Sequence, residues 1–555
     1  MNTTARPVWL FNSADVFAGN PKWLFLHVAK HRPDIDPVWI STSRQTTEFV
    51  RRLGFKAATF DSYTGRQLQE RASVYVVDQV KAHLPEPLRK ATLLNLWHGV
   101  GVKAVERAPG VAAADWRIAE KYIRNNQVFR NNQLFLVTSP LMEEHFRDQL
   151  GLGDDDLVRG GYPQNVYRQV HAPFRSFDHD LTGRRGLPAS TRVALYAPTW
   201  RRGPAAGFLH HALPDVPRLL EVLEQEDLLL VVKMHPKLVT DPVFLKMKQR
   251  YGAEPRLQFW DPAEDVYEVL PTIDIGVVDY SSIHYDMLAA GVRRFIRYAF
   301  DLEAFEDNVR PGLSYEDLSC GTMATSFDEL LAALRDPKAA DDATVERLLD
   351  TFWAYSTPDS LDGLVDRALT FEHRDVPLKT LYSFDVFDTV IHRRGVEPVS
   401  VFHYVAQRMA QSDLDFPEAL VRRFATIRGE AEISARNYYR RQEARAQSGD
   451  LEIGFDDIYD RLAHLYGLSA GQVEALKGWE IQGEIESSIP DRKNVAEVKK
   501  LVARGETVVL ISDMYLPNAV LKRILAAADP VLAELPLYLS NDHGVQKTTK
   551  RLYLT

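Results

Sequence analysis

Short apolar runs separated by longer mixed stretches recur along the first two-thirds of the chain. In its first part they lie at Pro7–Asn12, Val38–Ile40, Val74–Val77, Leu93–Leu96 and Leu134–Thr138, with one more between Gly54 and Phe60. Continuous apolar runs of this length are typical of parallel strands buried on both faces, and the stretches between them suit covering helices. The pattern predicts an α/β fold built on a parallel sheet.

A second series of strands follows the aperiodic stretch His171–Thr191, which is predicted to be a linker. These strands are expected at Arg192–Ala197, Leu228–Lys233, Leu257–Phe259, Asp274–Val278 and Arg293–Tyr298. Alternating strands and helices in each half predict two Rossmann-like domains, at residues 1–170 and 171–370.

Several helices carry boundary signals. Asn20 and Pro21 have the residue types of an N-cap and a first helical position, so a helix is predicted over Lys22–His31. Another is predicted over Pro262–Pro271. Two last helices, Val345–Ala354 and Leu361–Leu369, are expected to return to the first domain.

Polar residues follow the apolar strand of the segment Gly276–Gly291. Asp279, Ser281 and Ser282 come directly after Val278, and a helix that ends at Gly291 is predicted next. A helix start offers unpaired N–H groups and positive dipole, so this outline suits a phosphate. A plain serine N-cap without a ligand is the alternative. His284 and Asp286 are expected to have structural roles.

Three other predicted strands also end in polar residues. LYAPTWR ends at Arg201 and contains Thr199, VVKMHP contains His235, and NLWHGVGVK contains His98. The carboxyl edge of a parallel sheet is where such side chains meet and where open α/β sheets bind ligands. A lone His98 could equally be a core or capping residue. Lys103 could reach a phosphate or be a solvated surface lysine.

In this order, the four segments resemble the WHG, PTWR, HP and DYSS signatures of the CDP-glycerol glycerophosphotransferase family, the teichoic-acid and capsule polymerases and primases. The resemblance implies two Rossmann-like domains in a glycosyltransferase-B (GT-B) arrangement. It implies catalytic roles for His98 and His235, and donor binding by Gly99, Thr199, Arg201, Asp279, Ser281, Ser282 and Arg310. The family usually has Arg where Gln164 stands, so a charged contact there is in question.

The implied reaction moves glycerol phosphate, or a similar alditol phosphate, from a CDP-activated donor to an acceptor hydroxyl and releases CMP. The acceptor is expected to be a polyol phosphate or a glycan, lipid-linked ones included, in the synthesis of a bacterial surface polymer. No metal or other cofactor is expected for transfer. Two alternatives stay open: a GT-B glycosyltransferase using a nucleotide sugar, and a non-catalytic scaffold that carries a phosphatase.

Composition narrows the class of protein and its location. The net charge of −9 argues against a nucleic-acid partner, since nucleic-acid binders usually carry a basic face. The single cysteine, Cys320, excludes an intrachain disulfide and fits a reducing cytosol. We expect neither a signal peptide nor a spanning helix, because no apolar run reaches about 18 residues. A cytoplasmic location with, at most, peripheral membrane association follows.

A third domain is predicted at residues 377–555. LYSFDVFDTVIHRR, LISDMYLP and Lys547 resemble motifs of haloacid-dehalogenase-like (HAD-like) hydrolases. A helical cap is expected at about 395–495, with helices over Pro417–Ala446 and Phe455–Leu468. The resemblance implies Asp385 as nucleophile, Ser512 and Thr389 at the phosphate, and Mg²⁺ in an intact domain.

This third domain departs from the HAD pattern in two ways. Phe387 stands where the general acid is usual, and Asp388 follows one residue later. The sequence also ends at Thr555 before an acidic fourth motif, so the domain is expected to be incomplete. We therefore expect no hydrolysis of phosphate monoesters.

Overall fold

The computed structural model describes residues 6–14, 16–79, 86–101, 103, 130–150, 152–199, 208–235, 238–302, 313–377, 380–394, 397–440 and 452–554. They form two compact units, the first extending to Val376 and the second beginning at Pro377. Each unit is α/β with parallel main sheets, which confirms the predicted fold class.

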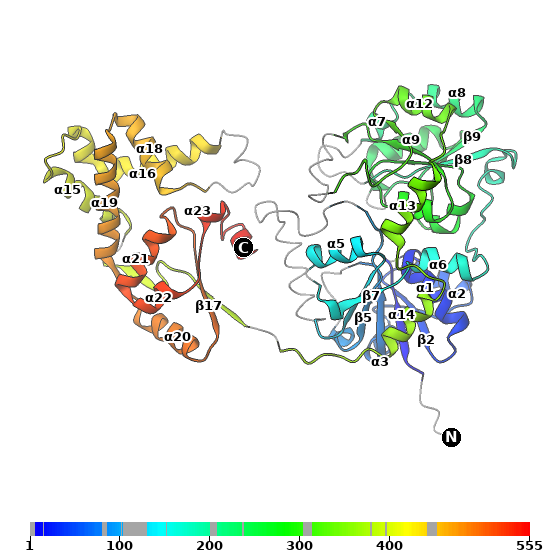
Figure 1. Ribbon diagram of the computed structural model, residues 1–555, viewed down its shortest axis with the longest axis horizontal. Helices are drawn as coiled ribbons and strands as arrows, with labels where there is room; N and C mark the ends of the chain where they lie inside the picture. Colours follow the sequence, from blue (N-terminus) through cyan, green and yellow to red (C-terminus); the bar gives the residue numbers. More distant parts are fainter. Residues whose placement is uncertain are drawn as a thin grey trace, which may run out of the picture. The chain divides into compact units, whose positions relative to one another are not determined.

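The first lobe of unit 1 is a seven-stranded parallel sheet of order β3-β2-β1-β4-β5-β6-β7 (Figure 1). Its strands are β1 (Val8–Phe11), β2 (Asp36–Ser41), β3 (Ala57–Thr59), β4 (Ala72–Val77), β5 (Thr92–Asn95), β6 (Gln133–Val137) and β7 (Leu157–Arg159). Its helices are α1 (Gly19–His31), α2 (Arg44–Arg52), α3 (Tyr63–Arg71), α5 (Pro140–Leu150) and α6 (Pro163–Val170), with short 3₁₀ turns η1 (Glu86–Lys90) and η3 (Asp154–Asp156). Every residue of the central strand β1 is buried, because helices cover both faces of the sheet.

The predicted N-cap of the first helix is wrong. Helix α1 begins at Gly19 with Ala18 as its N-cap, so Asn20 lies inside the first turn. The Asn20 side chain is fully buried and donates from Nδ2 to the Trp97 carbonyl at 2.9 Å. A tertiary partner has therefore replaced the local capping bond that the sequence suggested.

The second lobe of unit 1 is a six-stranded parallel sheet of order β10-β9-β8-β11-β12-β13. Its strands are β8 (Arg192–Tyr196), β9 (Leu228–Val232), β10 (Leu257–Phe259), β11 (Ile275–Val278), β12 (Arg294–Tyr298) and β13 (Thr322–Ala324). Its helices are α7 (Leu209–Ala212), α8 (Val216–Gln225), α9 (Pro242–Tyr251), α10 (Ile283–Ala289) and α12 (Phe327–Arg335), and η4 (Gly183–Arg185) is a 3₁₀ turn. The edge strands β7 and β13, of three residues each, were not predicted.

The helix predicted over Pro262–Pro271 is also wrong. Two 3₁₀ turns, η7 (Val266–Glu268) and η8 (Leu270–Thr272), occupy this stretch. The Asp265 carboxylate accepts from the Tyr267 N–H and so caps a separate turn. Pro271 has no N–H to continue a helical ladder.

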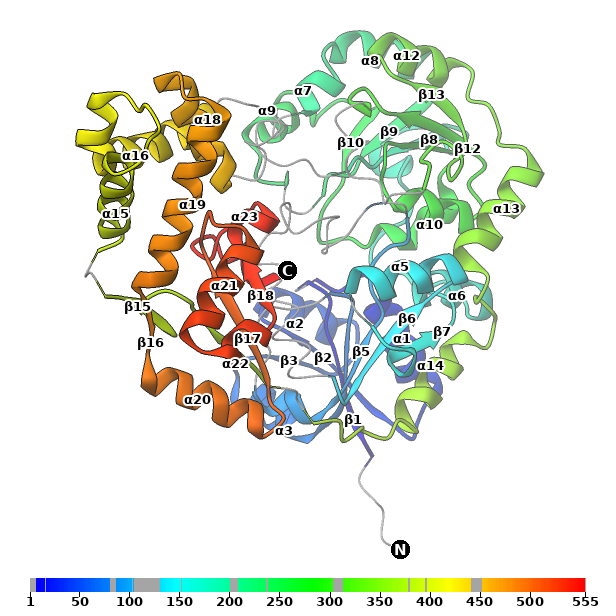
Figure 2. The same ribbon diagram turned by 60° about the vertical axis from the view of Figure 1, so that its left-hand side comes forward.

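The two last helices of unit 1 are α13 (Asp342–Trp353) and α14 (Ser360–Leu369), and α14 packs beside α1 and α6 of the first lobe (Figure 2). Ser360 Oγ accepts from the Gly161 N–H at 3.0 Å, and Arg32 forms an ion pair with Asp366 at 2.7 Å. The predicted return of the chain to the first lobe is confirmed.

A buried ion cluster joins the two lobes of unit 1. Lys22 Nζ of α1 lies 2.9 Å from Asp265 Oδ2 and also contacts Glu268 Oε1, and these side chains are at most 2% exposed. Ser176 donates its N–H to Glu268 Oε2 at 2.7 Å. Burial alone would raise the pKa of Glu268, but Lys22 and Ser176 lower it overall.

Unit 2 has a three-stranded parallel sheet of order β14-β17-β18 and a two-stranded antiparallel ribbon. The strands are β14 (Leu381–Phe384), β17 (Thr507–Ser512) and β18 (Leu537–Leu539), with β15 (Ile391–Arg393) and β16 (Ser488–Pro490) in the ribbon. The helices are α15 (Val399–Ala410), α16 (Glu418–Arg440), α18 (Phe455–Tyr466), α19 (Ala470–Ser487), α20 (Arg492–Ala503), α21 (Asn518–Ala528), α22 (Pro530–Glu534) and α23 (Ser540–His543), followed by the 3₁₀ turn η9 (Arg551–Leu554).

Helices α15, α16, α18 and α19 form a helical insertion between β15 and β16. Arg428 of α16 and Glu480 of α19 are fully buried and share two hydrogen bonds of 2.9 Å. Tyr459 of α18 donates to the same carboxylate at 2.6 Å. The sequence predicted α16 and α18 as cap helices but missed α15 and α19.

We predict that Lys22→Met lowers the free energy of unfolding of unit 1 by about 3 kcal/mol, because two buried carboxylates lose their countercharge. Urea unfolding followed by circular dichroism measures the change. Lys56→Met is the matched control: Lys56 pairs with Asp36 at the surface, its side chain is 61% exposed, and its loss should cost less than about 1 kcal/mol. Equal effects of the two substitutions would contradict the importance of the buried cluster.

Candidate active site

His98 lies on a strained turn directly after β5. Trp97 has φ of 52°, which is rare for a residue with a side chain, and its N–H donates to Asn95 Oδ1 at 2.9 Å. His98 Nδ1 lies 2.8 Å from the Asp78 carbonyl oxygen. A carbonyl only accepts, so Nδ1 carries the proton of the neutral ring and Nε2 keeps its lone pair. The exposed imidazole is therefore set up to accept a proton at Nε2.

Ser281 and Ser282 lie between β11 and α10. Ser282 occupies the N-cap position with φ −60° and ψ −21°, and its side chain makes no capping bond. This helical conformation differs from the extended one that lets an N-cap hydroxyl reach the helix N–H groups. The alternative of a plain serine N-cap is therefore not met at Ser282.

The His98 turn of the first lobe packs against the second lobe at two points. A Cβ added to Gly99 would lie 2.5 Å from Ser282 Oγ, so a larger residue here would force the serine side chain to move. Lys103 Nζ donates to Thr199 Oγ1 at 2.9 Å. The structure thus brings together the predicted residues His98, Gly99, Thr199 and Ser282, from the ends of β5, β8 and β11.

Asp279 holds the turn that carries Thr199. Its buried carboxylate accepts the Thr199 N–H at 2.8 and 2.9 Å and the Thr199 hydroxyl at 2.7 Å. Tyr315 donates to the Asp279 carbonyl at 2.7 Å. Asp279 therefore positions the turn that carries Thr199. Its direct contact with the nucleotide donor stays a prediction.

His235 lies three residues beyond the end of β9 and is half-buried. Strands β9 and β8 are neighbours, so His235 follows the same sheet edge as Thr199. Lys233, which the sequence analysis did not single out, lies on the same segment, and burial lowers its pKa although Asp265 opposes the shift. Arg201 and Arg310, both predicted to bind the donor, lie outside the described residues.

His284 and Asp286 of α10 are buried and bonded within the protein. The His284 ring stacks on Phe295, and burial lowers its pKa to about 3, so it stays neutral. Burial raises the pKa of Asp286 to about 6. Burial and contacts within the protein fit the structural roles expected for His284 and Asp286.

Gln164, which stands where the family usually has Arg, contacts the Asp286 carboxylate. Gln164 Nε2 and Asn165 Nδ2 of α6 donate to Asp286 Oδ1 at 3.0 and 2.9 Å. Arg168, one turn further along α6, is half-buried; burial lowers its pKa to about 10, while Asp286 raises it. The contacts of α6 to Asp286 Oδ1 are thus two amide hydrogen bonds, and the charge of Arg168 follows one turn later than the family pattern suggested.

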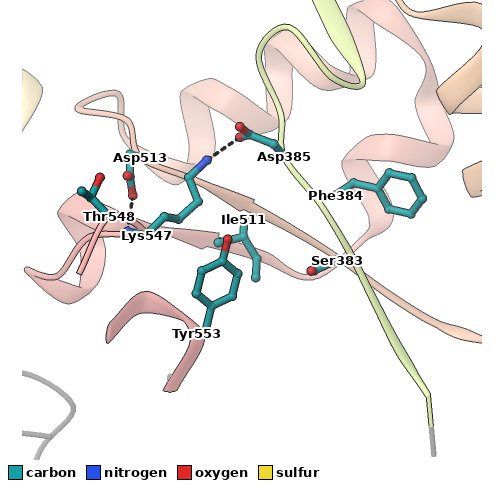
Figure 3. Close-up of a pocket in the computed structure, with 8 residues that line it drawn as sticks. All are labelled: Ser383, Phe384, Asp385, Ile511, Asp513, Lys547, Thr548 and Tyr553. Atoms are coloured by element: carbon teal, nitrogen blue, oxygen red, sulfur yellow. Dashed lines mark hydrogen bonds and ion pairs between the residues drawn. The ribbon is translucent and has the colours of Figure 1, made fainter. Parts of the chain in front are cut away.

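Unit 2 holds a pocket of about 340 Å³ at the carboxyl ends of β14 and β17 (Figure 3). Lys547 Nζ lies 2.7 Å from Asp385 Oδ1, and the Lys547 N–H donates to Asp513 Oδ1 at 2.8 Å. The structure therefore brings Asp385 and Lys547 together as predicted. Asp513 was missed, although it directly follows Ser512 at the end of a strand.

The other predicted residues of unit 2 are not among those that line this pocket. Ser512 is 2% exposed. The Asp388 carboxylate is 87% exposed and lies 3.7 Å from His392 Nδ1. The Phe387 ring packs under the Arg393 guanidinium at 4.1 Å. Thr389 is half-buried, and its carbonyl accepts from Asn494.

Comparison with known proteins gives the chain a family. Residues 2–367 match the model of the CDP-Glycerol:Poly(glycerophosphate) glycerophosphotransferase family. A teichoic acid poly(glycerol phosphate) polymerase of Bacillus spizizenii is 24% identical, over 64% of this chain and 90% of that protein. A teichoic acid glycerol-phosphate transferase of Staphylococcus aureus is 24% identical, over 53% of this chain and 74% of that protein.

Solved structures agree on the fold of unit 1. The wall teichoic acid polymerase TagF is 18% identical, with a TM-score of 0.53 over 66% of this chain and 88% of that one. At this identity the likeness shows the fold alone, and it supports a GT-B arrangement of the two lobes. The family match covers both lobes, so this chain belongs to the CDP-glycerol:poly(glycerophosphate) glycerophosphotransferase family and is a transferase.

Proposed function

We propose that this transferase moves glycerol phosphate from CDP-glycerol to a hydroxyl group of a polyol-phosphate acceptor and releases CMP. The observation that carries the proposal is the approach of Gly99 and Lys103 on one lobe to Ser282 and Thr199 on the other. Relatives named as glycerol-phosphate polymerases and transferases support it, as does a TagF structure whose name records a soak with CDPG.

In the proposed reaction, the acceptor hydroxyl oxygen attacks the β-phosphorus of CDP-glycerol. A new P–O bond forms, the bond from that phosphorus to the CMP oxygen breaks, and CMP leaves with the electron pair. His98 Nε2 takes the hydroxyl proton, because its Nδ1–H is held by the Asp78 carbonyl.

Positive charge and hydrogen-bond donors at the strand ends would bind the diphosphate. Lys103 of the first lobe and His235 of the second would contact the phosphates from opposite sides. The hydroxyl groups of Thr199, Ser281 and Ser282 would donate hydrogen bonds, and Arg201 is proposed to add a positive charge. Such groups stabilise charge that develops on the leaving phosphate, so the proposed reaction needs no metal ion. We propose the same serine and threonine contacts for CDP-ribitol or another CDP-alditol.

The proposed setting is the cytoplasm at the inner face of the cell membrane, with a lipid-linked acceptor at the start of a teichoic-acid or capsule chain. Within the described part of the chain, no helix is both long and apolar enough to cross a bilayer.

Donor selectivity tests the proposed function. The protein is incubated with an acceptor and CDP-glycerol, CDP-ribitol or UDP-sugars, and released nucleotides are separated by chromatography. We expect CMP from a CDP-alditol and no UDP from the sugars. Release of UDP alone would instead indicate an ordinary GT-B glycosyltransferase, and no release from any donor would favour a scaffold.

We predict that His98→Ala and His235→Ala each reduce CMP release by about 100-fold or more, because a general base or a charge-stabilising group is lost. His284→Phe should keep most activity, since His284 already stacks as a neutral ring on Phe295. Circular dichroism checks folding. Near-normal turnover of a folded His98→Ala or His235→Ala variant would remove that residue from the mechanism.

We also predict that EDTA leaves most CMP release intact, because lysine, histidine and hydroxyl groups bind the diphosphate in place of a metal. Initial rates are compared before and after chelation. Loss of transfer on chelation, with recovery on adding Mg²⁺, would show that a metal takes part.

For unit 2, we propose a HAD-like domain that does not hydrolyse alkyl phosphate monoesters. The Lys547–Asp385 contact, drawn in Figure 3, supports this proposal. Asp385 and Asp513 are oxygen ligands of the kind that Mg²⁺ prefers. No third His, Cys, Asp or Glu joins them within the described residues, so these residues do not complete a magnesium site.

The expected result with glycerol 3-phosphate and Mg²⁺ is no phosphate release above background. An alkoxide leaving group needs a proton, but Phe387 packs on Arg393 and the Asp388 carboxylate faces His392. Phosphate release is measured colorimetrically. Release that disappears in Asp385→Asn would show a working phosphatase and contradict the proposal.

A further inference from the structure

One buried amide, Asn20, holds the peptide that joins Trp97 to His98. The Trp97 carbonyl belongs to that peptide and accepts from Asn20 Nδ2 at 2.9 Å. Trp97 has φ of 52°, a conformation that side chains disfavour and that persists only where surrounding contacts fix it. Asn20 therefore supplies one of the contacts that keep His98 where it is.

Both ends of the Asn20 amide are used. Its Oδ1 accepts from the Gln164 N–H at 3.2 Å while its Nδ2 donates to Trp97, and the residue is fully buried. A backbone carbonyl only accepts and a backbone N–H only donates, so these partners fix the orientation of the amide. A side chain that both donates and accepts is required here.

The same contacts continue to the second lobe. The Gln164 N–H donates to Asn20 Oδ1, and the Gln164 side chain donates to Asp286 Oδ1 at 3.0 Å. Asp286 lies on α10, the helix that follows Ser282. The three side chains are at most 2% exposed, so water does not compete for their bonds.

We propose that Asn20 is a positioning residue for the transfer reaction. It fixes the peptide before His98 and ties that peptide, through Gln164 and Asp286, to the helix behind Ser282. The base of one lobe and the serine loop of the other are thus held by one buried chain of hydrogen bonds. This inference rests on the proposed role of His98 as base.

The test compares Asn20→Leu with Asn20→Asp in the full chain. Leucine has a similar size but neither donates nor accepts, so kcat for CMP release should fall by about 100-fold, as expected for a misplaced base. The KM for CDP-glycerol should change less than kcat, because the Gln164–Asp286 bond at the helix behind Ser282 does not itself involve Asn20.

The aspartate variant gives a signature that loss of packing would not give. Its carboxylate cannot donate to the Trp97 carbonyl, but its protonated form both donates and accepts, as asparagine does. The ratio of variant to wild-type kcat should therefore rise as the pH is lowered from about 8 to about 6, where a buried carboxyl gains its proton. Asp286 is present in both proteins, so its titration cancels in the ratio.

Asn132→Leu is the matched control. Asn132 is a buried asparagine of the same lobe, and its Nδ2 donates to the carbonyls of Arg89 and Ala91, which are not part of the transfer site. Its loss should lower the melting temperature but leave kcat unchanged. Melting temperatures of all variants are measured, and kcat is taken per folded protein.

A second readout does not depend on turnover. Diethyl pyrocarbonate modifies neutral imidazole nitrogens, and mass spectrometry gives its rate at His98 alone. Asn20→Leu should change this rate, and Asn132→Leu should not. Wild-type kcat in Asn20→Leu, or equal losses in both leucine variants, would overturn the proposal. If the wild type releases no CMP, the proposed function fails, and an unchanged His98 modification rate would overturn the positioning role as well.

Discussion

The transfer site depends on the close backbone approach of the His98 turn to the serine loop of the other lobe. Gly99 has room only for a hydrogen where a side chain would meet Ser282 Oγ. This approach places His98 and Lys103 of one lobe beside the hydroxyl groups of Thr199 and Ser282 at the edge of the other. Donors that are fixed in place stabilise developing charge better than mobile water does.

Buried polar groups fix how the two lobes of unit 1 meet. Lys22 lies between two carboxylates of the second lobe, and Asp286 is bonded to amides of the first. Such groups lose hydration when they are buried, so they are stable only in a geometry that pairs them all. Apolar surfaces tolerate sliding, whereas these contacts specify one register between α1, α6 and α10. The strained turn at Trp97 is bonded to Asn20 of α1, so its position depends on this register.

Unit 2 repeats the principle of polar residues at the ends of parallel strands. Asp385, Asp513 and Lys547 gather around one pocket, while a buried Arg428–Glu480 pair ties the inserted helices together. The position where the HAD pattern has its general acid is occupied by Phe387, which packs beneath Arg393, and the carboxylate of the next residue, Asp388, lies beside His392. A sequence motif can therefore match a family while only some of its side chains line the pocket.

The sequence by itself determined the parallel sheets, most strand positions and the grouping of His98, Thr199, His235 and the serines at strand ends. These follow from local rules, since buried strands need continuous apolar runs and their carboxyl ends share an edge. Only the tertiary structure decided the role of Asn20, the partners of Asp286 and the pairing of Lys22. Those contacts join residues 77, 122 and 243 positions apart, and no periodicity records a partner at such a distance. Asn20 is an example. Its residue type suits a helix cap, but in the folded protein its amide bonds to the turn before His98.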